Sequence, residues 1–341
     1  MPRTDGRLAL PWDLAEEVAP ELVRDIVHPR NRLNEMSGQR WLYFTKSVLP
    51  TAYPSGYSHK LRKAHGANKP PQLMAQLIEF FTKSDGRVLD PFAGVGGTLI
   101  GASIAPPAPR RCVGIEISPQ WIDVYDRVLA ENPDLRPQTM VAGDCIGVMD
   151  AWLAGEGVKA SDGSTVEATE GSFDFIVTDP PYNIHLPQTM SGSAGGAYTD
   201  SHANRRSDYN MRTAEEGDLA NLPDFESYLD AMEQVFARCF RLLRPSAYMA
   251  VIVRNAYQNG EYVFTQAELA RRAKNVGLVP KGELIWYQAG TRLRPYGYPY
   301  NFIPNIAHQY IVVLQRPQVA PKKGRARKPR TGALSNTGQA S

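Results

Sequence analysis

The chain has 341 residues, of which 43% are hydrophobic and 21% are charged, and its formal net charge is +3. This composition is ordinary for a globular protein, and no apolar run approaches the ~20 residues that a membrane span needs. The first residues also lack the apolar segment of a secretory signal, so we expect a cytoplasmic protein with no membrane segment.

The N-terminal part of the chain shows little sign of regular structure. Residues 1–64 have no sustained hydrophobic period, and we interpret them as a flanking region. Between residues 72 and 81 apolar side chains recur at helical spacing, and Gly86 then precedes a short apolar strand at 87–89. We therefore place the main domain at residues 65–316.

Apolar runs and helical periods alternate through this domain. The alternation predicts a doubly wound α/β fold, in which helices cover both faces of a mostly parallel, seven-stranded Rossmann-like sheet. No helical segment separates the last two strands, so we expect them to form an antiparallel terminal hairpin. The stretch 153–172 is predicted to be a loop. The other strands are predicted at 112–117, 139–142, 173–178, 248–253, 283–287 and 309–314, and the helices at 98–102, 119–130, 225–240 and 265–276.

A long polar segment, residues 183–222, interrupts this pattern. It contains few large apolar side chains, and loops of this length in compact domains are usually functional or disordered. We interpret it as a loop for target recognition, with Asn183, Arg205 and Arg206 on the substrate side.

Cations and aromatic residues alternate in a second segment of interest. Arg292 and Arg294 stand within eight residues of Tyr296, Tyr298 and Tyr300. This pattern suits a nucleic-acid strand or a flipped base. A tyrosine-rich hairpin packed on the sheet is an equal alternative.

The positive charge lies mainly at the C-terminal end. Residues 317–341 carry six Lys and Arg side chains and no acid, whereas the rest of the chain has 32 basic and 35 acidic side chains. We predict that this basic tail is disordered. Contact between the folded part and nucleic acid must then use local patches or the tail.

The cysteines indicate neither disulfides nor a metal site. Cys112, Cys145 and Cys239 are widely spaced, and no histidine cluster lies near them. We expect three buried thiols and no bound metal.

Acidic residues follow four of the predicted strands. They are Asp90, Glu116, Asp144 and Asp179. Ligands of a doubly wound sheet bind beyond the carboxyl ends of its strands, so these carboxylates should surround one site.

The first of these acids opens a glycine-rich turn, Asp90-Pro91-Phe92-Ala93-Gly94-Val95-Gly96-Gly97-Thr98. Such a turn lets a nucleotide-like cofactor approach bare backbone, and Glu116 follows the next strand. A dehydrogenase would fit these features almost as well. Its nicotinamide fingerprint needs G-x-G-x-x-G, however, and Leu99 occupies the position of the third glycine.

The last of the acids begins a second motif, Asp179-Pro180-Pro181-Tyr182, after the apolar run 173–177. It sets a carboxylate, a rigid turn and an aromatic ring side by side. Together with the glycine turn upstream, it indicates methyl transfer to an amino group on a flat base.

With both motifs in this order, the chain resembles the amino-group DNA methyltransferases that use S-adenosylmethionine and act on adenine N6 or cytosine N4. The resemblance covers about residues 65–315 and implies the class I methyltransferase fold. It places Glu116 at the ribose, Gly143 to Cys145 at the adenine, and the segment 65–73 near the methionine end of the cofactor. The cofactor residues that it implies are Lys69, Asp90, Pro91, Phe92, Ala93, Gly94, Gly96, Thr98, Glu116, Ile117, Asp144 and Cys145.

The resemblance also implies a catalytic group formed by Asp179, Pro180, Pro181 and Tyr182. Asp179 and the Pro180 carbonyl would accept the two N–H bonds of an amine, and Tyr182 would stack on a base flipped out of double-stranded DNA. Adenine is slightly favoured over cytosine. An RNA amino-methyltransferase and a catalytically idle binding protein are the alternatives, and a homodimer or a partner subunit stays open.

Overall fold

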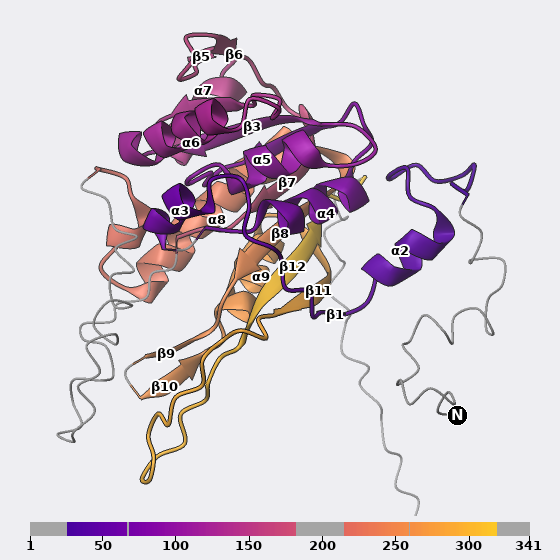
Figure 1. The fold of residues 1–341 in the computed structure, drawn as a ribbon. Helices are drawn as coiled ribbons and strands as arrows, with labels where there is room; N and C mark the ends of the chain where they lie inside the picture. Colours follow the sequence, from indigo (N-terminus) through magenta and orange to yellow (C-terminus); the bar gives the residue numbers. More distant parts are fainter. Residues whose placement is uncertain (1–25, 67, 182–214, 259, 319–341) are drawn as a thin grey trace, which may run out of the picture.

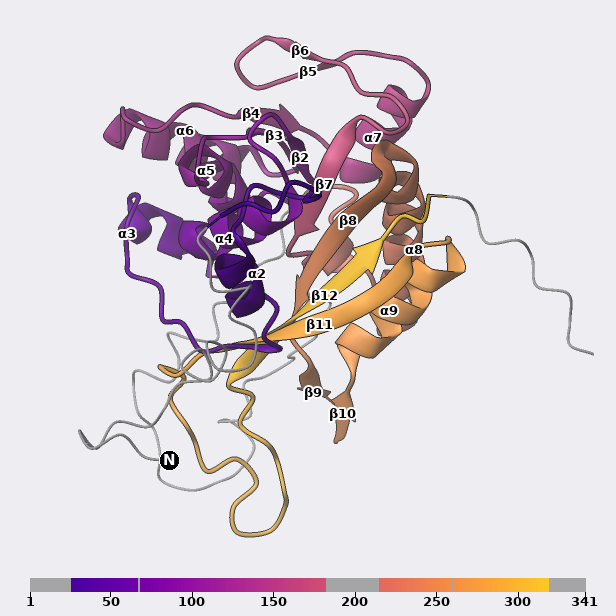
Figure 2. The same ribbon diagram turned by 90° about the vertical axis from the view of Figure 1, so that its right-hand side faces the viewer.

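The computed structural model describes residues 26–66, 68–181, 215–258 and 260–318. Their centre is an eight-stranded sheet in the order β1-β11-β12-β8-β7-β2-β3-β4, with helices on both faces (Figures 1 and 2). The strands are β1 (Val48–Leu49), β2 (Arg87–Asp90), β3 (Arg111–Glu116), β4 (Thr139–Ala142), β7 (Phe173–Thr178), β8 (Leu243–Val253), β11 (Val279–Tyr287) and β12 (His308–Gln315).

The predicted topology is confirmed, but the sheet has eight strands rather than seven because β1 joins it. Strands β4, β3, β2, β7 and β8 are parallel neighbours, and β12 is antiparallel both to β8 and to β11. All seven predicted strands are present, and the last two form the antiparallel hairpin. Strands β8 and β11 begin earlier than predicted. The prediction missed these residues because 244–246 of β8 and 279–283 of β11 are exposed and show no apolar alternation.

Helices divide the core into two layers. Cluster residues from α4, α5 and α6 pack on one face of the sheet, and those from α7, α8 and α9 pack on the other. Neighbouring strand residues alternate between the layers, as shown by Val88 and Leu89 of β2, because successive side chains of a strand point to opposite faces. The helices are α4 (Pro71–Phe81), α5 (Gly97–Ile104), α6 (Pro119–Glu131), α7 (Cys145–Leu153), α8 (Phe225–Leu242) and α9 (Thr265–Asn275).

One local expectation was wrong, and one helix was missed. The stretch predicted as loop, 153–172, contains the antiparallel hairpin β5 (Val158–Lys159) and β6 (Thr165–Val166), and the Trp152 indole donates to the Val166 carbonyl at 3.1 Å. Helix α7 had not been predicted either. A strand of two residues is too short to show a hydrophobic period, so the sequence pattern could not predict this hairpin.

The described part of the predicted flanking region packs on the sheet. Helix α2 (Gly38–Phe44) places Phe44 in a stack on Phe80 of α4, with ring centroids 3.9 Å apart. Strand β1 then extends the sheet as a parallel neighbour of β11. The described residues before residue 65 therefore pack with the main domain.

Two general properties of the described residues bear on function. No helix among them combines the length and the apolar character of a membrane span. The three cysteines are buried free thiols, as expected.

Candidate active site

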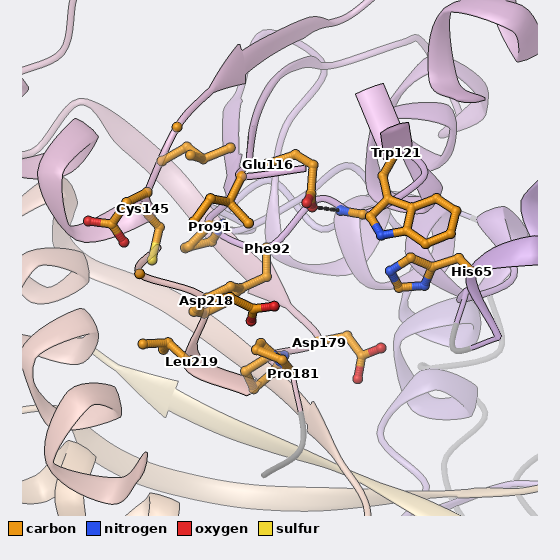
Figure 3. A pocket seen from close by; sticks show the side chains of 17 residues that line it. His65, Pro91, Phe92, Glu116, Trp121, Cys145, Asp179, Pro181, Asp218 and Leu219 are labelled. Carbon is orange, nitrogen blue, oxygen red and sulfur yellow. Dashed lines mark hydrogen bonds between the residues drawn. The ribbon is translucent and has the colours of Figure 1, made fainter. Parts of the chain in front are cut away.

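A pocket opens at the carboxyl ends of the parallel strands (Figure 3). The space that protein atoms leave free in the pocket and at its open mouth is about 680 Å³. Most of the predicted site residues within the described ranges line it: Pro91, Phe92, Gly94, Glu116, Ile117, Asp144, Cys145, Asp179, Pro180 and Pro181. The two motifs, distant in sequence, thus share one pocket.

Asp90 holds the glycine turn in place through hydrogen bonds. Its carboxylate is buried and accepts bonds from the Phe92 backbone amide at 3.0 Å, the Thr178 hydroxyl at 2.8 Å and the Thr98 hydroxyl. Desolvation raises the pKa of this carboxyl to about 6, although the three hydrogen bonds oppose the shift. Through these hydrogen bonds Asp90, the last residue of β2, connects that strand to the glycine turn and to β7.

Close packing explains the glycines of the turn. Gly96 has a φ of +77°, and a Cβ there would lie 2.1 Å from the Tyr125 ring. Gly94 has a φ of +51° and faces the His65 ring.

Five predicted cofactor residues are not among the residues that line the pocket. They are Lys69, Asp90, Ala93, Gly96 and Thr98.

Glu116, at the end of β3, is buried, and its carboxylate can accept further hydrogen bonds. One carboxylate oxygen accepts from the Gly94 amide at 2.8 Å, and the other accepts from the Ser118 amide at 2.9 Å. A carboxylate has about four lone-pair sites, so each oxygen can accept a further donor from the pocket. Desolvation raises the Glu116 pKa to about 7, and the charges of Asp90 and Asp218 add to that effect against the two amide bonds.

Asp144 has a structural partner that the sequence interpretation did not include. It is the N-cap of α7, and its side chain accepts from the amides of Ile146 at 3.3 Å and Gly147 at 2.8 Å. Asp144 and Cys145 both line the pocket.

Asp179 makes an ion pair at the pocket wall. Its carboxylate contacts the ammonium of Lys69, and the two side chains are 15% and 6% exposed. The resemblance assigned Lys69 to the cofactor, whereas the structure brings it to the carboxylate of the second motif. Tyr182, the last residue of that motif, lies outside the described residues.

A buried arginine holds the loop that carries Lys69. Arg62 donates to the carbonyls of Tyr57 at 2.9 Å, Gly56 at 3.1 Å and Lys69 at 3.2 Å. Burial lowers its pKa to about 10, a value at which the guanidinium is still charged at neutral pH. These bonds join two loop segments and set the backbone from which Lys69 reaches Asp179.

Two aromatic rings close one side of the pocket. Figure 3 shows His65 beside Trp121, and their ring centroids lie 4.8 Å apart at an interplanar angle of 77°. Burial, assisted by the Lys69 charge, lowers the His65 pKa to about 4, so the imidazole is neutral at physiological pH. Its buried Nδ1 has no hydrogen-bond partner among the described residues.

The end of the long polar loop also reaches the pocket. Gly217, Asp218 and Leu219 line it, and the Asp218 carboxylate caps the turn Leu219–Asn221 by accepting from the Ala220 amide at 2.9 Å. Sequence reasoning assigned this loop to the target and missed its contact with the cofactor side. Trp121 was likewise recognised only as a helix residue.

The predicted substrate residues fall into two groups. Asn183, Arg205 and Arg206 lie outside the described residues. Arg292, Arg294 and Tyr296 lie between β11 and β12, away from the described pocket lining. The alternative of a tyrosine-rich hairpin packed on the sheet is wrong, because the tyrosines of this segment are exposed.

No group of three or more His, Cys, Asp or Glu side chains within the described ranges has the arrangement of a metal site.

Comparisons with known proteins agree with the motifs. A family model described as DNA methylase matches residues 24–127 and 173–336. The type II methyltransferase M.HinfI of Haemophilus influenzae is 37% identical over 76 residues, which are 21% of this chain and 20% of that protein. A tRNA (guanine(10)-N2)-dimethyltransferase of Methanothermobacter thermautotrophicus is 29% identical over 177 residues, 52% of this chain and 42% of that protein. The chain spans less than half the length of the curated relatives it matches.

Solved structures share only a general likeness. TrmN from Thermus thermophilus superposes with a TM-score of 0.40 at 13% identity, over 72% of this chain and 47% of that one. With a TM-score this low, the superposition places no functional residue in this chain.

Proposed function

The chain belongs to the DNA methylase family whose model it matches, and from this membership we propose that it methylates the exocyclic amino group of a base in double-stranded DNA. It is an S-adenosylmethionine-dependent methyltransferase. The observation that carries the proposal is that Asp179 and Pro180 line the same pocket as Gly94 of the glycine turn and Glu116.

The pocket residues fit the cofactor. The free lone pairs of Glu116 suit two neighbouring ribose hydroxyls, and the unpartnered Nδ1 of His65 suits a polar group at the methionine end. When bound, S-adenosylmethionine supplies a methyl group on a positively charged sulfur. A neutral His65 adds no positive charge to a pocket that must accept this cation.

Asp179 and the Pro180 carbonyl would act on the target amine. The lone pair of an exocyclic amine is delocalised into the ring, which makes the nitrogen a poor nucleophile. Two acceptors that take its N–H bonds favour a tetrahedral nitrogen, and the Asp179 charge stabilises the positive charge that develops there. A base can reach this wall only after leaving the duplex, at a cost of a few kcal/mol. We favour adenine N6 slightly over cytosine N4.

RNA is the second candidate substrate. It is favoured by the match to the archaeal tRNA dimethyltransferase, which covers more of this chain than the match to M.HinfI does. The same acceptors would serve a guanine amino group.

The identity of the methylated nucleoside tests the proposal directly. The protein is incubated with isotopically labelled S-adenosylmethionine and with genomic DNA or total RNA, and the products are digested and separated as nucleosides. We expect label in N6-methyladenine from DNA. Label in RNA alone would support the second candidate, and label in neither would contradict both.

The affinity for the cofactor is expected to depend on pH through Glu116. With a pKa of about 7, this carboxyl is mostly ionised at about pH 8 and only about one tenth ionised at about pH 6, so the dissociation constant should rise roughly tenfold as the pH falls. Only the ionised form accepts both ribose hydroxyls. Isothermal titration calorimetry measures the effect. The Glu116→Gln variant should bind weakly with little pH dependence, and a flat profile for the unmodified protein would contradict the ribose assignment.

A further inference from the structure

Residues 288–307, here called the arm, leave the sheet at the edge that holds the pocket. Strand β12 is antiparallel both to β8 and to β11, so β11 runs in the same direction as β8 and its parallel neighbour β7. The carboxyl ends of β7 and β11 therefore lie at one edge. In Figures 1 and 2 the arm, between β11 and β12, projects past every other described element.

The arm has an internal structure that fixes its tip. The Asn305 side chain accepts from the Arg294 amide at 2.8 Å and donates to the Arg294 carbonyl at 2.7 Å. Gly297 has a φ of +72°, and a Cβ there would lie 2.3 Å from the Asn301 carbonyl oxygen. The Asn301 amide closes this turn by donating to the Gly297 carbonyl at 2.7 Å. The tip residues are thus presented on a defined turn.

Large apolar side chains of the arm point into solvent. Leu293, Tyr298, Tyr300 and Phe302 are 68%, 80%, 89% and 87% exposed, which makes them the most exposed large apolar residues in the described part of the chain. Apolar side chains gathered at one protruding site usually mark an interaction surface. We therefore expect these side chains to be buried when another molecule binds to the arm.

The charge of the arm indicates the partner. It contains Arg292 and Arg294 and no acidic residue. Guanidinium groups bind phosphates, and aromatic rings stack on or wedge between bases. We propose that the arm holds the DNA duplex beside the target base, with Arg292 and Arg294 on phosphates and Tyr298, Tyr300 and Phe302 against the bases. This proposal rests on the proposed function, since the same edge must then receive the DNA.

Binding to a fluorescently labelled duplex, measured by anisotropy over a range of salt concentrations, tests the arm. The Tyr298→Ala/Tyr300→Ala variant should raise the dissociation constant at least tenfold at fixed salt, with the salt dependence unchanged. The Arg292→Gln/Arg294→Gln variant should lower the slope of log affinity against log salt by about two, because each phosphate contact contributes about 0.9. Both variants should bind S-adenosylmethionine normally, because the arm lies outside the described pocket lining.

Matched controls are available elsewhere on the surface. Phe264, 58% exposed, and Arg127 on α6, with a side chain 57% exposed, are not part of the arm. Phe264→Ala and Arg127→Gln should leave both the affinity and the slope unchanged.

Three outcomes would overturn the proposal. They are duplex binding unchanged in both arm variants, lost affinity for single-stranded RNA but not for the duplex, and a changed oligomeric state on size-exclusion chromatography. The last would make the arm a subunit contact. The proposed function fails by a different result, namely a wild-type protein that binds S-adenosylmethionine and methylates no nucleic acid.

Discussion

Replacing Asp179 by asparagine is expected to lower kcat for methyl transfer about 10²–10³-fold, the usual effect of removing one electrostatic contact to a charge that develops in the transition state. The carboxylate lies at the pocket wall, where it can accept an N–H bond of the amine and stabilise a positive nitrogen. An amide keeps the shape and one acceptor but loses the charge. Single-turnover transfer with labelled cofactor, under saturating substrate, measures the step.

A control variant must distinguish a loss of catalysis from a loss of folded structure. Asp150 on α7 pairs with Arg238 at the surface, and its side chain is 53% exposed. Asp150→Asn makes the same chemical change in an ion pair outside the pocket lining, so the rate should be unaffected. Cofactor affinity should be nearly normal in both variants. If Asp179→Asn transferred methyl groups at the wild-type rate, the catalytic assignment would be wrong.

The strand-end acids could be located from sequence because two local signals agree. Apolar runs mark the strands, and the alternation with helices places the carboxyl ends of parallel strands at one edge. Glu116 and Asp179 consequently both line the pocket. The same reasoning cannot distinguish a carboxylate that faces a ligand from one that holds a turn, as Asp90 does, because that depends on which hydroxyls pack beside it.

Other parts of the site have no local signal. Asp218 and Leu219 end a polar loop with no period, and their contact with the pocket is a product of tertiary folding. The Lys69 contact with Asp179 depends on how Arg62 holds a loop that precedes the cofactor motif. A lysine before two prolines is equally compatible with a solvated loop, so its partner was not predictable.

The ion pair of Lys69 and Asp179 is expected to show strong coupling in a double-mutant cycle. Both side chains are largely buried, and removing one partner of a buried pair typically costs about 3–5 kcal/mol because the other charge stays in a poorly solvated place. Lys69→Met and Asp179→Asn should each lower the free energy of unfolding by an amount of this order. The double variant removes both charges and should lose much less than the sum. Urea unfolding of the four proteins measures the coupling.

Activity should follow a different pattern across the same four proteins. Lys69→Met keeps the Asp179 carboxylate, so its folded fraction should retain more activity than Asp179→Asn does. The double variant should regain stability and remain as inactive as Asp179→Asn, because stability depends on both charges and methyl transfer depends on the carboxylate. Additive losses of stability would show that the pair contributes no coupling. Recovery of stability and activity together would show that Asp179 acts through the fold rather than on the amine.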